Sequence, residues 1–176
     1  MGKTKLQSVN IRIQAVVLNY LNHRDASSGR LVEYVSQLPR RYPQTRRYHG
    51  FTRDQAKSVV EQLQHIGVVD DLRYAKNMLA SLRQRTIGAA KILAHLRRRR
   101  VSEEVIRSVS LAEDSGGLRD LRRAITDAQR KCDHLLRQAG SDRRKRSRVK
   151  WSVASFLLRR GYRGKEFDDI MRAVVV

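Results

Sequence analysis

Residues 88–106, GAAKILAHLRRRRVSEEVI, decide the fold class, because their pattern predicts two helices joined by a short turn. Apolar residues recur in the first half at steps of three and four, as a half-buried helix requires: Ala89, Ile92, Leu93 and Leu96. After the turn, Ser102 can cap a second helix, and Glu103 and Glu104 suit the positive end of its dipole. The stretch therefore predicts a helix–turn–helix unit.

The same periodicity extends outward from this unit. The further apolar stripes are Ala56, Val59, Val60, Leu63 and Ile66; Leu72, Ala75, Leu79 and Leu82; Leu118, Leu121, Ile125, Ala128, Cys132 and Leu135; Val149, Val153, Phe156 and Leu157; and Phe167, Ile170 and Val174. Each fits one face of a helix, so we predict an all-α protein. Tyr74 and Trp151 have apolar neighbours, and we expect both in the core, with Tyr162 also packed inside.

The beginning of the chain fits two structures. An alternating, strand-like pattern is formed by Val9, Ile11, Ile13 and Ala15. A helical pattern is formed by Ile13, Val17, Tyr20 and Leu21. Because the rest of the chain offers no strong strand partner, we predict a helix.

Three turns resemble one another and indicate an internal repeat. They are Gly50-Phe51-Thr52, Arg100-Val101-Ser102 and Gly161-Tyr162-Arg163, each between a basic helix end and an acidic helix start. Glycine best tolerates the left-handed conformation that closes a helix, and Thr52 can cap the next helix as Ser102 does. We predict three tandem three-helix repeats, 1–66, 67–112 and 113–176, in an elongated, curved array. Two segments interrupt the pattern: a basic loop at 39–49 and a basic linker at 140–150.

The composition is strongly basic. Lys and Arg number 38 against 17 Asp and Glu, which gives a net charge of +21. Such a surplus attracts polyanions, nucleic acid first, although it could also serve solubility alone. Cys132 is the single cysteine, which suits a reducing compartment, and neither a signal-peptide core nor a membrane-spanning apolar run occurs. We expect a cytoplasmic protein without a membrane partner.

Several segments carry a family resemblance. Gly67–Ala75 (GVVDDLRYA) ends one helix and begins the next with two acids, followed by Arg-Tyr-Ala. Gly88–Arg97 has the pattern Gly-x-x-Lys-Ile-x-x-x-Leu, which Val101-Ser102-x-Glu104-x-Ile106 continues. Phe156–Tyr162 (FLLRRGY) has the pattern Leu-x-x-Arg-Gly-aromatic, with Asp169-Ile170 beyond it. In this order and spacing the segments resemble the RecX family, regulators of the RecA recombinase.

The resemblance spans about Val59 to Ala173, with a weaker likeness from Val17 to Phe51, and has specific implications. It implies three tandem three-helix units that bind RecA and lodge in the groove of its nucleoprotein filament. It further implies inhibition of ATP hydrolysis, strand exchange and filament growth, and hence a role in recombination, DNA repair and the SOS response. Arg100 stands where the family usually has Gly, so we expect that turn to close differently. The 39–49 loop and the high charge also depart from the family, and the charge favours more direct DNA contact.

Four basic clusters are the candidates for contact with RecA or DNA. They are Arg40, Arg41, Arg46 and Arg47, interleaved with Tyr42 and Tyr48; Arg97, Arg98, Arg99 and Arg100; Arg143, Arg144, Lys145, Arg146, Arg148 and Lys150; and Arg159, Arg160 and Arg163. Guanidinium groups bind phosphates and carboxylates bidentately, and tyrosines can stack on bases. The alternatives are a solvated loop for the first cluster, helix-dipole compensation for the second, and a disordered linker for the third.

The sequence gives no basis for catalysis, a cofactor, a metal or a small-molecule substrate. Asp70 and Asp71 are adjacent and diverge on a helix, so we expect them to cap it. Cys132 and His134 do not converge on one metal, and the remaining histidines have no ligand spacing. We therefore expect a binding protein and not an enzyme. A general DNA-binding protein with helix-turn-helix-like units, independent of RecA, is the alternative.

Overall fold

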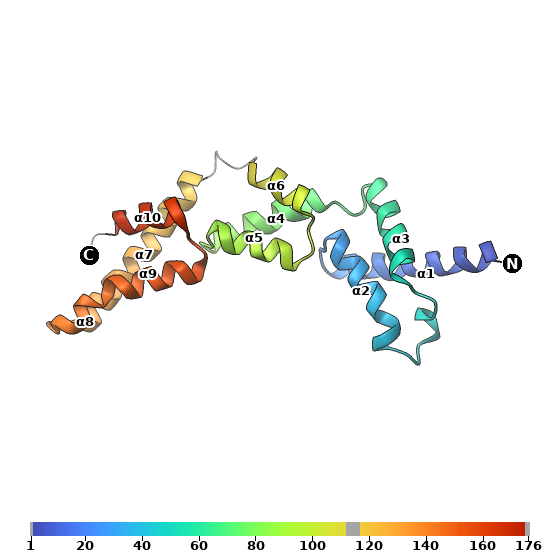
Figure 1. Ribbon diagram of the computed structural model, residues 1–176, viewed down its shortest axis with the longest axis horizontal. Helices are drawn as coiled ribbons and strands as arrows, with labels where there is room; N and C mark the ends of the chain where they lie inside the picture. The colour runs from blue at the N-terminus through green and yellow to red at the C-terminus, as the bar shows by residue number, and fades with distance from the viewer. Residues whose placement is uncertain (1, 112–116, 175–176) are drawn as a thin grey trace. The chain divides into compact units, whose positions relative to one another are not determined.

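The computed structural model describes residues 2–111 and 117–174, and all secondary structure within these ranges is helical (Figure 1). The helices are α1 (Gly2–His23), α2 (Ser28–Arg41), the 3-10 helix η1 (Arg46–Tyr48), α3 (Arg53–His65), α4 (Asp71–Gln84), α5 (Ala89–Arg98), α6 (Glu103–Leu111), α7 (Gly117–Ala139), α8 (Arg143–Ser147), α9 (Val149–Arg160) and α10 (Gly164–Ala173). The all-α prediction is confirmed, and so is the helical beginning of the chain. None of the described helices has the length and apolarity needed to cross a membrane.

The chain forms two compact units. Unit 1 comprises Met1–Lys76 and Leu96–Arg107, and unit 2 comprises Asn77–His95 and Ser108–Val176. Helices α4, α5 and α6 are thus each divided between the units. The division into three repeats therefore stays a prediction.

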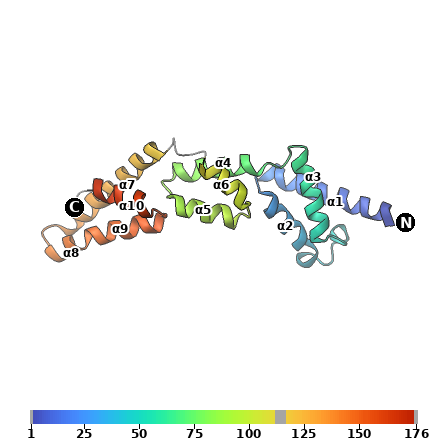
Figure 2. The same cartoon turned by 45° about the horizontal axis from the view of Figure 1, so that its top comes forward.

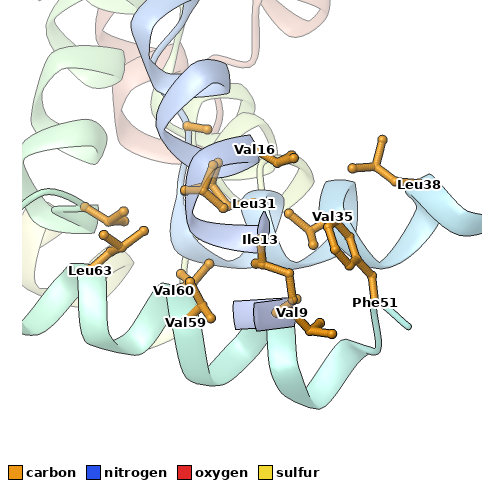
Figure 3. Close-up of a cluster of buried hydrophobic side chains, with 14 residues drawn as sticks. Val9, Ile13, Val16, Leu31, Val35, Leu38, Phe51, Val59, Val60 and Leu63 are labelled. Atoms are coloured by element: carbon orange, nitrogen blue, oxygen red, sulfur yellow. The ribbon is translucent and has the colours of Figure 1, made fainter. Parts of the chain in front are cut away.

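Unit 1 is built around α1, α2 and α3, which pack against one another through their apolar faces (Figure 3). One buried apolar cluster of this unit contains Val9, Ile13, Val16, Val17, Ala26, Leu31, Val35, Leu38, Phe51, Ala56, Val59, Val60, Leu63 and Val69. Each Val, Leu, Ile or Phe side chain among them contributes roughly 1.5–3 kcal/mol on burial. Phe51 comes from the turn before α3, so the same turn that ends the loop also anchors the core. Thr52 then caps α3 in a reciprocal pair with Gln55, as its position predicted.

The basic loop of unit 1 is shorter than predicted. Helix α2 runs through Pro39 to Arg41, and the Tyr42 N–H still donates to the Leu38 carbonyl at 2.9 Å. Proline lacks an N–H but does not prevent the few residues after it from completing the last turn. The irregular segment therefore begins at Tyr42 and soon tightens into η1.

Unit 2 is built around α7, α9 and α10, and Figures 1 and 2 both show α9 beside α7. One buried apolar cluster of this unit contains Ala124, Ala128, Cys132, Val149, Val153, Leu157, Tyr162, Ile170 and Val174. The linker predicted at 140–150 is largely helical, because α8 begins after Asp142, whose carboxylate accepts from the N–H groups of Arg144 and Lys145 at 2.9 and 3.1 Å. The interpretation of this segment as a disordered linker is therefore wrong.

The turn at Arg100 closes as a glycine turn does. Arg100 has φ 61°, close to φ 81° at Gly50 and φ 90° at Gly161. Behind it, the Val101 N–H donates to the Leu96 carbonyl at 3.2 Å and the Arg100 N–H to the Arg97 carbonyl at 2.9 Å, the pair of bonds that defines a Schellman motif. The expectation of a different closure is wrong, because the helix-ending hydrogen bonds fix the backbone whichever residue stands there.

Glycine permits a close contact between a helix start and a distant turn in each unit. In unit 1, a Cβ placed on Gly29 would lie 2.5 Å from the Arg100 carbonyl oxygen. In unit 2, a Cβ on Gly88 would lie 2.6 Å from the backbone of Gly161 and Tyr162, and the Gly88 N–H donates to the Arg160 carbonyl at 2.9 Å. The starts of α2 and α5 are therefore held in the same way.

Candidate protein and nucleic-acid binding surfaces

The four arginines at the end of α5 divide into two pairs. Arg97 Nε lies 2.8 Å from a carboxylate oxygen of Glu103, and this hydrogen bond lowers the pKa of Glu103. Arg100 lies 3.7 Å from Glu33. Arg98 and Arg99 are exposed, and neither forms an ion pair with another described residue. This middle pair is thus available to an external anion.

The basic cluster at Arg40–Arg47 in unit 1 has exposed side chains, and hydrogen bonds from Arg12 hold the backbone of its second half. The Arg12 guanidinium donates to the carbonyls of Arg46, Arg47 and His49 at 3.2, 2.9 and 3.3 Å. Tyr48 packs against the core, with its ring 5.8 Å from that of Phe51. The side chains of the cluster that lie exposed are Arg40, Arg41, Tyr42, Arg46 and Arg47. Sequence inspection missed Arg12, which lies far from the loop along the chain.

The cluster around α8 is exposed along its whole length. Lys145 lies 3.7 Å from Asp142, and Arg146 donates to the Gly140 carbonyl at 3.2 Å. Within the described parts of the chain, no ion pair involves the other four basic residues of this cluster: Arg143, Arg144, Arg148 and Lys150.

The last cluster contains one structural arginine. Arg160 lies 3.2 Å from Asp127, hydrogen bonds to the Thr86 hydroxyl, and stacks 4.6 Å from the centre of the Phe156 ring. These contacts use both the charge and the flat face of the guanidinium group. Arg160 therefore holds α9 to α7 and to the end of α4 within unit 2. Arg159 and Arg163 are exposed.

A hollow of about 560 Å³ in unit 2 gathers arginines that lie far apart in the sequence. Its lining includes Arg85, Arg122, Arg123, Arg130 and Arg160, with Asp127 as its only carboxylate. Sequence inspection missed the first four because it sought contiguous basic runs. The pattern that could have revealed three of them is their recurrence along α7, where residues several positions apart share a side of the helix.

A groove of about 470 Å³ in unit 2 contains the only tryptophan of the chain. Its lining is Lys131, Leu135, Arg148, Trp151, Ser152, Ser155 and Arg159. Trp151 is 77% exposed, so the expectation that it is a core residue is wrong. The buried positions of α9 are Val149, Val153 and Leu157, and a residue two positions after Val149 lies on the opposite side of the helix. Tyr74 and Tyr162 are buried as predicted.

The polar residues considered for chemistry have structural partners. Asp70 accepts from the Arg73 N–H at 2.9 Å, which confirms its capping role. Asp71 instead joins the start of α2, accepting from the Ser28 N–H at 2.7 Å and from its hydroxyl at 2.6 Å. Cys132 is buried, and burial raises the pKa of its thiol. Within the described residues, no group of three or more His, Cys, Asp or Glu could hold a metal ion.

Two family motifs of the sequence meet in unit 2. Gly88 packs on the turn at Gly161 and Tyr162, and Lys91 Nζ donates to the Arg159 carbonyl at 3.0 Å. The Gly-x-x-Lys helix start and the Arg-Gly-aromatic turn therefore form one contact.

Comparison with known proteins gives consistent results. No family model matches the chain. The chain is 34% identical over 141 residues to the regulatory protein RecX of Trichlorobacter lovleyi, covering 80% of this chain and 83% of that protein. It is 28% identical to the regulatory protein RecX of Pelodictyon phaeoclathratiforme, covering 72% and 73% of the two chains. The crystal structure of RecX from Lactobacillus salivarius superposes with a TM-score of 0.70 at 14% identity, covering 94% of this chain and 96% of the other. Its sequence relatives are RecX proteins, and its fold agrees with that of a RecX crystal structure. This chain therefore belongs to the RecX family of regulatory proteins.

Proposed function

We propose that this chain modulates the RecA recombinase by binding in the groove of the RecA–DNA filament. Its effect is inhibitory: it lowers ATP hydrolysis and strand exchange, and thereby regulates recombination and DNA repair. The mode of action is occupancy, in which contacts to DNA and to RecA subunits stabilise the filament in one state and exclude a second duplex.

One observation carries the proposal beyond family membership: exposed arginines without an acidic partner. Arg98 and Arg99 in unit 1 are examples, as are Arg143 and Arg144 in unit 2. Guanidinium groups bind phosphate and carboxylate in paired hydrogen bonds, so both DNA and acidic protein surfaces are suitable ligands. A filament offers both along its length.

The test is RecA ATPase activity on single-stranded DNA, titrated with the full chain. We expect inhibition that saturates. The variant Arg98→Gln/Arg99→Gln should raise the half-inhibitory concentration about tenfold, since each lost phosphate contact weakens binding several-fold at physiological salt.

Arg97→Gln/Arg100→Gln is the matched control, because it removes the same charge from arginines that already pair with Glu103 and Glu33. It should shift the titration much less. An ATPase rate that does not change at any concentration of the chain contradicts the proposal.

The arginine hollow of unit 2 favours a second candidate, a general DNA-binding protein that does not require RecA. Its helix-turn-helix-like units would contact the phosphate backbone. The helices that follow the turns carry Asp54, or Glu103 and Glu104, in their first turn, and DNA phosphates would repel these carboxylates. A steep loss of DNA affinity with salt, unchanged by RecA, would favour this candidate.

A further inference from the structure

We propose that the groove around Trp151 is a subsite for single-stranded nucleic acid. One base stacks on the Trp151 indole, and Lys131, Arg148 and Arg159 contact the phosphates on either side. This inference goes beyond the proposed function, because it requires no RecA.

The exposure of Trp151 is the first observation that supports the subsite. At 77% it is the most exposed large apolar side chain among the described residues. Helix α9 packs on α7 through its other side, with Val153 fully buried, so Trp151 makes no contribution to the core. A large aromatic ring left in water loses a substantial burial energy, and such rings are enriched where a ligand binds.

The charges around the ring identify the kind of ligand. The lining contains Lys131, Arg148 and Arg159 and no carboxylate. In the part of the chain that the structure describes, none of these three cations forms an ion pair. An apolar protein segment in the groove would remove these cations from water without compensation, which is costly. A polyanion compensates them.

The flat indole distinguishes single strands from duplexes. Bases in a duplex are already stacked, whereas a single strand presents free faces that aromatic side chains can cover. Leu135, from α7, adds an apolar surface to the same groove. A ring for the base and cations for the backbone are the combination by which proteins bind single strands without sequence preference.

The spacing along α9 also suits a strand. Arg148, Trp151, Ser155 and Arg159 follow one another at steps of three and four, which places them on one side of the helix. The row extends about 16 Å along the helix axis, long enough for more than one nucleotide. Lys131 contributes from α7, the neighbouring helix.

The arginine hollow adjoins the groove in sequence. Arg130 and Arg160 line the hollow, whereas their neighbours in the sequence, Lys131 and Arg159, line the groove. In this proposal a strand bound at Trp151 continues toward Arg122 and Arg123. The two sites contribute different interactions: the hollow supplies positive charge but no aromatic ring, whereas the groove supplies both.

The experiment uses the full chain and a fluorescently labelled oligothymidylate, without RecA. Since Trp151 is the only tryptophan, its intrinsic fluorescence reports stacking directly. We expect quenching that follows the anisotropy of the labelled strand, and little quenching by a duplex of equal length at equal occupancy.

Substitutions then separate stacking from charge. By anisotropy, Trp151→Leu should weaken binding to the strand about tenfold, whereas Trp151→Phe, which keeps an aromatic face, should stay within about threefold of the unchanged chain. Ile66→Ala, at an exposed apolar residue of unit 1, is the control and should have no effect. Arg122→Gln/Arg123→Gln should weaken binding but leave the quenching at saturation unchanged.

Three results would overturn the subsite. They are saturation by anisotropy without quenching, equal affinity of Trp151→Leu and the unchanged chain, and equal quenching by duplex and single strand. If Trp151→Leu keeps its affinity for the strand but loses affinity for RecA filaments, the groove is a protein contact and the inference fails while the proposed function stands. Circular dichroism of each variant verifies folding, and the quenching of Trp151 in the unchanged chain keeps the test decisive if Trp151→Leu does not fold.

Discussion

At the scale of single residues, backbone conformation and helical position decide more than residue type does. Arg100 takes the left-handed conformation of a glycine because the Schellman hydrogen bonds of its turn require it. Thr86, with φ 52°, does the same at the end of α4. Residue type alone suggested a different turn at Arg100. The prediction that Trp151 lies in the core was wrong for a related reason. Its neighbours in the sequence are apolar, but Trp151 lies on the side of α9 opposite to the buried residues.

The conformation of Arg100 leads to a prediction for stability. Arg100→Gly should stabilise the fold by about 1 kcal/mol, because a left-handed residue with a Cβ is strained and the exposed ion pair with Glu33 contributes little. For a chain of this size the melting temperature should rise by about 2–4 °C.

Ala94→Gly, in the interior of the same helix, is the control for added backbone entropy and should destabilise the fold by about 1 kcal/mol. Thermal unfolding followed by circular dichroism measures both variants. If Arg100→Gly lowers stability as much as Ala94→Gly does, Arg100 does not have the left-handed backbone conformation described above.

At the scale of elements, the sequence predicted helices well and their contacts poorly. Apolar periodicity and capping residues such as Thr52 and Ser102 locate helices, because these are local effects. The positions of Pro39 and of the 140–150 segment were misjudged, since tertiary packing and the Asp142 cap extend helices where composition suggests loops. That Gly88 packs on the turn at Gly161 could not be predicted, because it depends on residues brought together only by folding.

The Gly88 contact gives a prediction of opposite sign to helix propensity. Inside a helix, changing Gly to Ala gains stability, but Gly88 is the buried residue immediately before α5, where Gly is itself preferred to Ala. Here Gly88→Ala should destabilise by about 2–3 kcal/mol, because the new methyl group would overlap the backbone of Gly161 and Tyr162.

Gly67→Ala is the comparison: nothing lies within 4 Å of its added Cβ, so only the strain of its φ of 75° is introduced, about 1 kcal/mol. Urea unfolding of both variants measures the difference. A Gly88→Ala variant more stable than the unchanged chain would show that the close contact does not exist.

At the scale of the whole molecule, charge and family indicate the partner, and the fold determines which cations can reach it. The net charge of +21 predicted a polyanion, and the basic runs were found without the structure. Which arginines of these runs form ion pairs was not predictable from the sequence. The partners of Arg97, Arg100 and Arg160 are acidic residues that only folding brings close to them. The arginine hollow and the Trp151 groove were also missed, since each combines α7 with residues from other parts of unit 2.

The most direct test of RecA regulation compares two affinities of the full chain at the same salt concentration. One is for single-stranded DNA covered by RecA in the presence of a non-hydrolysable ATP analogue, and the other is for the same DNA without RecA. We predict that the filament binds at least about tenfold more tightly, a difference of about 1.4 kcal/mol, because it adds protein contacts to the phosphate contacts. Equal or weaker binding to the filament would contradict the regulation of RecA by this chain.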